Sequence, residues 1–352
     1  MLKIALESLG CSKNLVDAEI MMGILNKKGY KLVGDFEEAD IILVNTCGFI
    51  ESAKQESIQT ILELAQLKET ANLKLLIVTG CLAQRYAEEL KTEIPEIDAI
   101  VGTGSYQQID EIIANLEKEN HIVSLNDIDF AYNEDLPRYV STPDYMAYLK
   151  IGEGCDNKCT YCIIPYARGG KVRSRDLESI VSEVEKLVLN GYKEVVLTGI
   201  HVASYGKDVR DENINLLTVI KAINEINGIE RIRLSSVEPV LFTDEFVNEV
   251  SKMEKVCPHY HLSLQSGCDE TLKRMNRRYT TKEYKEIVDR LRENIPNVAI
   301  TTDVIVGFPG ETNDEFNKTY EFLKEIELSQ MHVFKYSPRK GTPAATMENQ
   351  ID

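Results

Sequence analysis

The sequence lacks any apolar segment that approaches the roughly 18 uninterrupted residues needed to span a bilayer. Its first residues, MLKIALESLGC, also lack the long apolar run and the small-residue cleavage site of a signal peptide. The first absence excludes a helical membrane span, and the second excludes a secreted precursor. Together they predict a cytoplasmic protein with no membrane partner.

Positive charge is also scarce, because 40 lysines and arginines face 57 aspartates and glutamates and the net charge is −17. Since an acidic surface repels phosphate, the sequence excludes a nonspecific nucleic-acid binder. A local basic site is still compatible with this charge, and the candidates are Lys171, Arg173, Arg175, Lys273, Arg274, Arg277 and Arg278. The alternative is that these residues are solvated charges of loops and helices.

The length of 352 residues and the hydrophobic content of 43% allow a sizeable core and suggest about two domains. In residues 1–123, short apolar segments such as IILVNTCG alternate with segments of helical periodicity. This alternation predicts an α/β domain with an open parallel sheet of the flavodoxin-like or Rossmann-like kind. Residues 124–145 are rich in Asp, Asn and Pro, which predicts a linker.

A second strand–helix series occupies residues 146–352. Its expected strands are YLKI, EVVLTG, RIRLSS, YHLSLQS, ITTDVIVGF and MHVFKYS. Helical segments such as Leu177–Leu189 and Lys282–Arg292 lie between them. Six β/α units in order predict an open, partial (β/α)6 barrel.

Eight cysteines are present, and in a reducing cytosol metal ligands or buried thiols are expected rather than disulfides. Cys155, Cys159 and Cys162 form a C-x3-C-x2-C pattern directly after the first expected strand of the second domain. Three thiolates can hold a 4Fe–4S cluster and leave one iron open for a substrate. The alternative is a zinc knuckle or a redox loop, but no Cys or His in the next thirty residues completes a zinc site.

Cys11, Cys47 and Cys81 each end an expected strand of the first domain, in LGC, NTC and TGC. Because the carboxyl ends of parallel strands share one edge of the sheet, where open α/β folds bind ligands, these residues are predicted to converge. Three cysteines at equivalent positions favour a second cluster, although cysteine also occupies buried strand ends without such a role. Cys257 and Cys268 lack such partners and are expected to be ordinary, partly buried thiols.

The three-cysteine motif on the first strand of a six-unit barrel resembles the radical S-adenosylmethionine superfamily over about residues 146–337. The resemblance implies that the open iron binds S-adenosylmethionine and that one-electron reduction yields a 5′-deoxyadenosyl radical. Cys155, Cys159 and Cys162 would then be the catalytic residues. The segment DVIVGFPGE would lie beside the adenosine, with Gly307, Pro309 and Gly310 binding the cofactor because they allow close backbone approach.

The two halves together resemble the methylthiotransferase family over nearly the whole chain. The motifs are LGCSKN, NTCGFI, VTGCLAQR, EGCDNKCTYCIIPYARG, VRSR, LQSGCDETLKRMNRRYT and GFPGET. The resemblance implies an enzyme with two 4Fe–4S clusters, of which the one on Cys11, Cys47 and Cys81 supplies or carries sulfur. The radical would remove hydrogen from an unactivated carbon, and a second S-adenosylmethionine would supply the methyl group. The small C-terminal β-barrel domain usual in this family is expected to be absent.

The halves resemble different branches of that family. LGCSKNLVDAE and NTCGFIESAKQESI resemble the branch that modifies an aspartate on a small-subunit ribosomal protein, whereas the barrel motifs resemble the branch that modifies threonylcarbamoyladenosine in transfer RNA. Because the barrel should line the reaction cavity, transfer RNA is the expected substrate, with the ribosomal protein as the alternative. An electron donor is also expected, and the sequence does not identify it.

A protein of another class, an iron–sulfur electron carrier, is the remaining alternative. Such a carrier needs fully ligated clusters, and both triplets supply only three ligands. The sequence therefore favours an enzyme.

Overall fold

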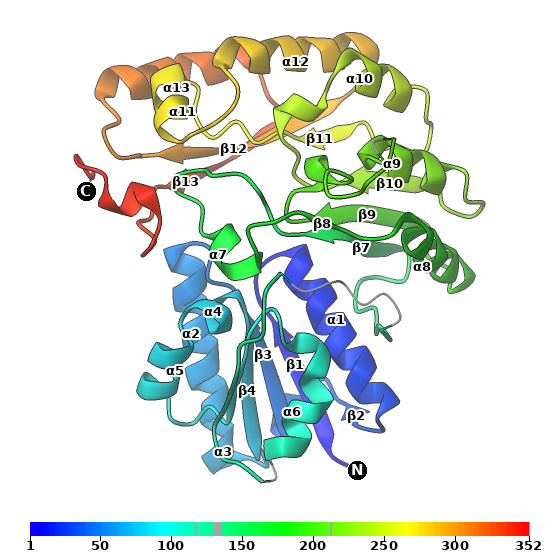
Figure 1. Cartoon of the computed structure of the whole chain (residues 1–352), viewed down its shortest axis with the longest axis vertical. Coiled ribbons are helices and arrows are strands. Elements are labelled where there is room, and N and C mark those ends of the chain that lie inside the picture. Colours follow the sequence, from blue (N-terminus) through cyan, green and yellow to red (C-terminus); the bar gives the residue numbers. More distant parts are fainter. Residues whose placement is uncertain (117, 130–135, 212, 352) are drawn as a thin grey trace. The chain divides into compact units, whose positions relative to one another are not determined.

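The structure, a computed structural model, describes residues 1–116, 118–129, 136–211 and 213–351 (Figure 1). The chain forms two compact units. The first contains Met1–Thr142 and Ile164–Arg173, and the second contains Pro143–Ile163 and Ser174–Asp352. The expected boundaries at 1–123, 124–145 and 146–352 do not include this return of Ile164–Arg173 to the first unit. Residues 130–135 of the expected linker lie outside the described residues.

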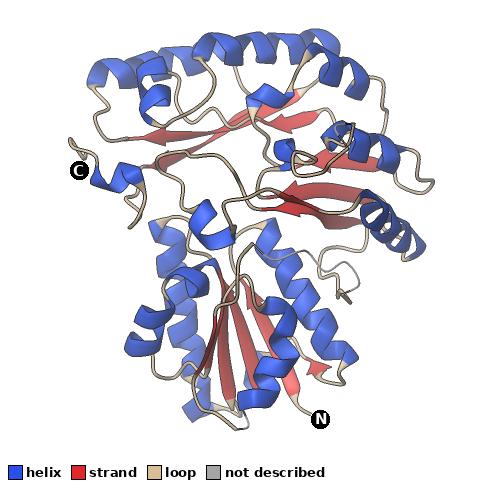
Figure 2. Cartoon of the chain, in the orientation of Figure 1, coloured by secondary structure: helices blue, strands red, loops and turns tan. Residues whose placement is uncertain are grey.

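A six-stranded parallel sheet forms the centre of the first unit, in the order β2-β1-β3-β4-β5-β6. Helices lie on both faces of this sheet (Figure 2), so the strand at Ile41–Thr46 is buried along its whole length. The strands are β1 (Lys3–Ser8), β2 (Lys31–Leu32), β3 (Ile41–Thr46), β4 (Leu75–Gly80), β5 (Ala99–Val101) and β6 (Ile122–Ser124). This order has the topology of flavodoxin-like folds and confirms the predicted fold class.

The helices of the first unit follow these strands in alternation. They are α1 (Ser12–Lys27), α2 (Glu51–Ala65), α3 (Leu67–Thr70), α4 (Cys81–Arg85), α5 (Ala87–Glu93), α6 (Ile109–Leu116) and α7 (Ile164–Arg168). Part of the core lies between the sheet and α2, where Val44, Ile61 and Val78 are fully buried. The strands β2 and β6 were not predicted, because two or three residues are too short to show a periodic pattern.

The second unit contains two parallel sheets, a four-stranded one in the order β10-β9-β7-β8 and a three-stranded one in the order β11-β12-β13. Isolated bridges from Ile232 to Val256 and from Val237 to Leu262 connect their neighbouring edges. The strands are β7 (Met146–Glu153), β8 (Arg173–Ser174), β9 (Glu194–Gly199), β10 (Arg231–Leu234), β11 (His259–His261), β12 (Ala299–Val306) and β13 (Gln330–Lys335). The six predicted barrel strands are present in sequence order, which confirms the partial barrel.

The helices of the second unit pack one apolar stripe against these strands. In the helix at residues 281–294, Tyr284, Ile287, Val288 and Leu291 recur at helical spacing and are buried. The helices are α8 (Leu177–Leu189), α9 (Leu216–Asn224), α10 (Asp244–Val250), α11 (Asp269–Arg274), α12 (Thr281–Asn294) and α13 (Asn313–Ile326). Short 3₁₀ helices lie at Phe36–Glu38, Tyr106–Gln108, Val202–Ser204, Pro239–Leu241 and Pro343–Thr346. No helix in the described part of the chain is long and apolar enough to cross a bilayer.

The end of β4 requires glycine. Gly80 has a φ of +96°, and a Cβ there would lie 2.4 Å from the carbonyl oxygen of Thr46, whereas Gly29, with a φ of +91°, has no atom within 4 Å of its Cβ position. An alanine at a positive φ lowers the free energy of unfolding by about 1 kcal/mol. At Gly80 the clash of its Cβ with the Thr46 carbonyl lowers it by about 2 kcal/mol more. In urea unfolding, Gly80→Ala should therefore lower the free energy of unfolding of the first unit by about 3 kcal/mol, and Gly29→Ala by about 1 kcal/mol. Equal losses of unfolding free energy in the two variants would contradict the close approach of the Thr46 carbonyl to Gly80.

Candidate metal centres

Three cysteines of the first unit follow three neighbouring strands. Cys11 lies shortly after β1, Cys47 directly after β3, and Cys81 opens α4 directly after β4. The strands β1, β3 and β4 are adjacent in the sheet, and Thr46 pairs with Gly80 in the register of β3 and β4. The structure therefore brings these three thiols to one edge of the sheet.

The environment of these thiols opposes their ionisation. Burial raises the pKa of Cys81 to about 11, even though the charge of Arg168 favours the thiolate. Burial also raises the pKa of Cys47, and the nearby Cys11 thiol adds to the effect. Three thiolates at this edge therefore need a cationic partner, which a metal centre supplies.

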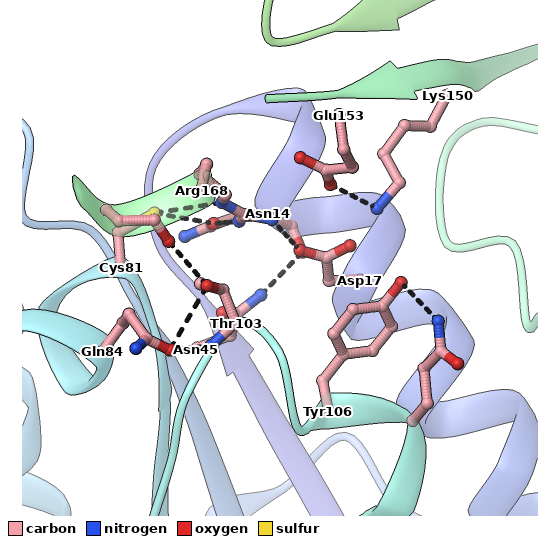
Figure 3. Close-up of polar contacts among 12 residues, drawn as sticks. Asn14, Asp17, Asn45, Cys81, Gln84, Thr103, Tyr106, Lys150, Glu153 and Arg168 are labelled. Carbon is pink, nitrogen blue, oxygen red and sulfur yellow. Dashed lines mark hydrogen bonds and ion pairs between the residues drawn. The ribbon is translucent and has the colours of Figure 1, made fainter. Parts of the chain in front are cut away.

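Arg168 of α7 contacts this group of thiols directly. Its Nε lies 3.3 Å from Cys81 Sγ, and its guanidinium donates to the Asp17 carboxylate and the Asn14 side-chain oxygen (Figure 3). Asn14 in turn donates to the Thr46 carbonyl at 2.8 Å. All of these side chains are buried, so the hydrogen bonds hold the guanidinium against the thiol in a fixed geometry.

The cysteines of the second unit lie in the loop after β7. Cys162 N donates to the Cys159 carbonyl at 3.1 Å, which makes this part of the loop a tight turn. Cys159 and Cys162 pack against a buried apolar cluster of Tyr161, Met275, Ile305, Phe308 and Ala344. Burial accordingly raises the pKa of Cys159.

A charged network surrounds two of these thiols. Arg277 Nη1 lies 3.2 Å from Cys159 Sγ, and its Nη2 lies 3.1 Å from Glu238 Oε1. Glu238 Oε2 lies 3.1 Å from His201 Nε2. Burial lowers the pKa of His201, but hydrogen bonds with Cys155 and Glu238 outweigh it and raise that pKa to about 9. The network therefore places one cation beside Cys155 and another beside Cys159.

Burial raises the pKa of Glu238, but the hydrogen bond from His201 and the charge of Arg277 lower it overall to about 2. Glu238 is thus a fixed anion that holds both cations in place. A pocket of about 340 Å³, lined in part by His201, Glu238 and Arg278, opens beside this network. It offers space for a ligand beside His201 and Glu238.

The residues expected to bind cofactor form the turn after β12. Gly307 and Gly310 have φ values of +71° and +75°, and a Cβ at Gly307 would meet no atom closer than 4.0 Å. Phe308, between Gly307 and Pro309, is buried and packs edge-to-face on Tyr161, with ring centroids 6.3 Å apart. The structure therefore brings this open backbone turn beside the cysteine loop.

Sequence reasoning missed Arg168, His201 and Glu238, and it named Arg277 only as a candidate of a local basic site. Arg168 lies 87 residues from Cys81 in the chain, and no local pattern connects them. His201 and Glu238 had a usable signal, because each follows an expected barrel strand, EVVLTG or RIRLSS, at the edge where ligands bind. Cys257 and Cys268 are buried, and Cys268 Sγ donates to Glu270 at 2.9 Å, as suits ordinary thiols.

Both cysteine triplets fit multi-iron clusters better than single ions. Among the residues that the structure describes, one group of three His, Cys, Asp or Glu side chains has its ligand atoms within 4.8 Å of one another. This group contains no cysteine, so it is neither of the two triplets. Two sulfurs on one zinc ion lie at most about 4.6 Å apart, because the Zn–S bond is about 2.3 Å. In the structure, therefore, neither triplet has all three sulfurs close enough together to share one zinc ion.

Comparison with known proteins identifies the class of enzyme. Residues 3–102 match the Uncharacterized protein family UPF0004, and residues 149–323 match the Radical SAM superfamily. Ribosomal protein uS12 methylthiotransferase RimO of Clostridioides difficile is 56% identical over 352 residues, which cover 100% of this chain and 79% of the relative. RimO of Geotalea uraniireducens is 48% identical, with 99% of this chain and 78% of the relative covered. The chain therefore belongs to the radical S-adenosylmethionine methylthiotransferase family.

It is accordingly a methylthiotransferase that uses two 4Fe–4S clusters and S-adenosylmethionine. Solved structures of low identity share its fold. The methyltransferase TsrM from Kitasatospora setae has a TM-score of 0.69 at 13% identity and covers 98% of this chain and 75% of its own. The cobalamin-dependent enzyme OxsB has a TM-score of 0.63 at 14% identity, and the match covers 92% of this chain and 52% of the OxsB chain.

The ion pair between Arg168 and Asp17 is buried, whereas Lys74 pairs with Asp40 at the surface at 2.9 Å. Removing one partner of a buried pair leaves a charge out of water, which costs on the order of 3 kcal/mol, and removing an exposed partner costs less than about 1 kcal/mol. Arg168→Met should therefore destabilise the first unit by about 3 kcal/mol, and Lys74→Met should change it by less than about 1 kcal/mol. Urea unfolding of the reduced, cluster-free chain measures the loss of unfolding free energy in both variants. Similar losses in the two variants would contradict the structural importance of Arg168.

Proposed function

We propose that this enzyme attaches a methylthio group to an aspartate of ribosomal protein uS12. The observation that carries the proposal is the 56% identity to the Clostridioides difficile uS12 methylthiotransferase along the whole chain. This identity extends through the barrel, although the barrel motifs alone resemble the branch that modifies transfer RNA. The comparisons thus favour the alternative substrate over transfer RNA.

The charges of the molecule support a protein substrate. Most of the basic residues considered as phosphate contacts are already engaged by carboxylates, in the pairs Arg173–Asp129, Arg175–Glu183, Arg274–Glu315 and Arg277–Glu238. A guanidinium that already neutralises a carboxylate contributes little to phosphate binding. The net charge of −17 instead attracts a basic protein. A ribosomal substrate would also place the enzyme in the cytoplasm, with a separate electron donor.

Each thiol triplet has a separate role in this proposal. Cys155, Cys159 and Cys162 hold the cluster that binds S-adenosylmethionine, and Cys11, Cys47 and Cys81 hold the second cluster. When bound, the clusters and S-adenosylmethionine supply the radical, the sulfur and the methyl group.

The protein's own groups bind and orient these cofactors. His201 and Arg277 stabilise the thiolates of Cys155 and Cys159, because each places a cation within contact distance. Arg168 does the same for Cys81. At Gly307 and Gly310, in the turn after β12, a cofactor can approach the backbone without meeting a Cβ.

Replacing the two triplets separately should divide the iron and the activity. We expect about eight irons per reconstituted chain, and about half after replacement of either triplet by alanine. The Cys155/Cys159/Cys162 variant should lose S-adenosylmethionine cleavage. The Cys11/Cys47/Cys81 variant should keep cleavage but form no methylthio product. Iron analysis and separate counting of deoxyadenosine and methylthio product test this assignment.

The double variant Cys257→Ala, Cys268→Ala is the matched control and should keep all of its iron and activity. If the Cys155/Cys159/Cys162 variant still cleaves S-adenosylmethionine, the assignment of the two clusters is reversed or wrong.

Substrate choice is tested by offering both substrates to one enzyme. The chemically reduced enzyme is incubated with uS12 and with transfer RNA bearing threonylcarbamoyladenosine, separately and in competition. Mass spectrometry should find the methylthio group on uS12, because the whole chain resembles uS12 methylthiotransferases. A uS12 variant without the target aspartate is the control. Product on transfer RNA alone would refute the proposed substrate.

A further inference from the structure

Three side chains with metal-binding groups meet on the three-stranded sheet, outside the cysteine sites. His261 belongs to β11, Asp303 to β12 and His332 to β13. In the register of these parallel strands, His261 pairs with Thr301, and Asp303 pairs with His332. Because Thr301 and Asp303 are two residues apart on one strand, all of these side chains project from the same face of the sheet.

The three side chains already have the spacing of a metal site. His261 Nε2 lies 3.1 Å from Asp303 Oδ2, and His332 Nδ1 lies 3.2 Å from Asp303 Oδ1. One ligand atom from each residue lies within 4.8 Å of the other two. The two imidazole rings are stacked, with centroids 5.8 Å apart and planes 27° apart. A single ion between these atoms would therefore need only small side-chain movements.

A hydrogen bond on the far side of one ring supports this role. His261 Nδ1 lies 2.9 Å from Thr301 Oγ1, so this hydroxyl fixes the ring with Nε2 facing the carboxylate. Metal-binding histidines commonly have such a partner on the nitrogen that does not bind the metal. The exposed fractions of the side chains are 13% for His261, 28% for Asp303 and 56% for His332. The group is thus anchored on one side and open to an ion on the other.

We propose that His261, Asp303 and His332 form a binding site for one divalent first-row transition metal ion, such as Zn²⁺ or Fe²⁺, separate from both clusters. Two imidazoles and one carboxylate are a donor set that suits these ions, and three protein ligands leave coordination positions open. In the bound form His261 would offer Nε2 to the ion and donate its Nδ1–H to the Thr301 hydroxyl, and His332 would offer Nδ1.

The position of this site in the barrel gives it access to the reaction space. Ile305 follows Asp303 on the same face of β12, roughly 7 Å along the strand. Ile305 packs in the apolar cluster that contacts Cys159 and Cys162. The open positions of the ion therefore lie on the same side of the sheet as the cysteine loop. The inference rests on the contacts among His261, Asp303 and His332 and does not depend on the proposed substrate.

The experiment measures zinc binding by the holoenzyme. Anaerobically prepared enzyme with both clusters is dialysed against Zn²⁺, and zinc and iron are counted in the same sample. We expect about one zinc per chain with unchanged iron, and at least tenfold weaker zinc binding in His332→Ala and in Asp303→Asn. Both variants should retain their iron, which also reports that they are folded. His121→Asn is the control, because His121 belongs to the first unit, has its Nδ1 3.0 Å from the Ile97 carbonyl oxygen, and lies outside the group.

X-ray absorption at the zinc edge then identifies the donors. Ligands at about 2.0–2.1 Å with imidazole scattering are expected, whereas sulfur at about 2.3 Å would place the zinc on cysteines and overturn the proposal. The proposal is also overturned if zinc does not bind, or if His121→Asn weakens zinc binding as much as His332→Ala does. Because no activity is measured, failure here is distinguishable from failure of the proposed function.

Discussion

The parallel direction of the strands is the constraint on which both centres depend. In a parallel sheet the carboxyl ends of all strands lie at one edge. The first residues after these ends no longer form hydrogen bonds between strands. Cys47 and Cys81 occupy these positions in the first unit, and His201 and Gly307 do so in the second. Residues far apart in sequence are thereby brought together without any long loop, and this is how two separate units each build a site from successive strand ends.

Burial of the thiols creates a second requirement, which both units satisfy in the same way. One guanidinium touches one thiol in each triplet, Arg168 on Cys81 at 3.3 Å and Arg277 on Cys159 at 3.2 Å. A carboxylate then holds each guanidinium, Asp17 in one unit and Glu238 in the other. Hydrogen bonds to cluster sulfurs are among the factors that set reduction potentials. If the cysteines hold the clusters as proposed, the two arginines would therefore influence electron transfer as well as stability.

The limits of sequence reasoning follow from the range of the signals it uses. The strands and the cysteines at their ends were predictable because periodicity and spacing are local. The strand-end positions of His201 and Glu238 were also local signals, but their contacts with each other and with Arg277 were not predictable, since the three residues come from different strand–loop segments. The two-residue strands β2 and β8 were too short to carry a pattern. The expected preference for transfer RNA relied on a few barrel motifs, and identity over the whole chain favours the ribosomal protein instead.

The return of Ile164–Arg173 to the first unit has a consequence for how such enzymes can be recombined. The chain passes between the units at residues 142–143, 163–164 and 173–174, so neither unit is a continuous piece of sequence. A gene fusion that joins the first 145 residues of one enzyme to the barrel of another would give the recipient a foreign α7, and with it a foreign Arg168. In such a fusion, the helix α7 would come from the enzyme that supplies the barrel. The buried contacts of Asp17 and Asn14 would therefore be preserved only if that α7 also carries an arginine in the position of Arg168.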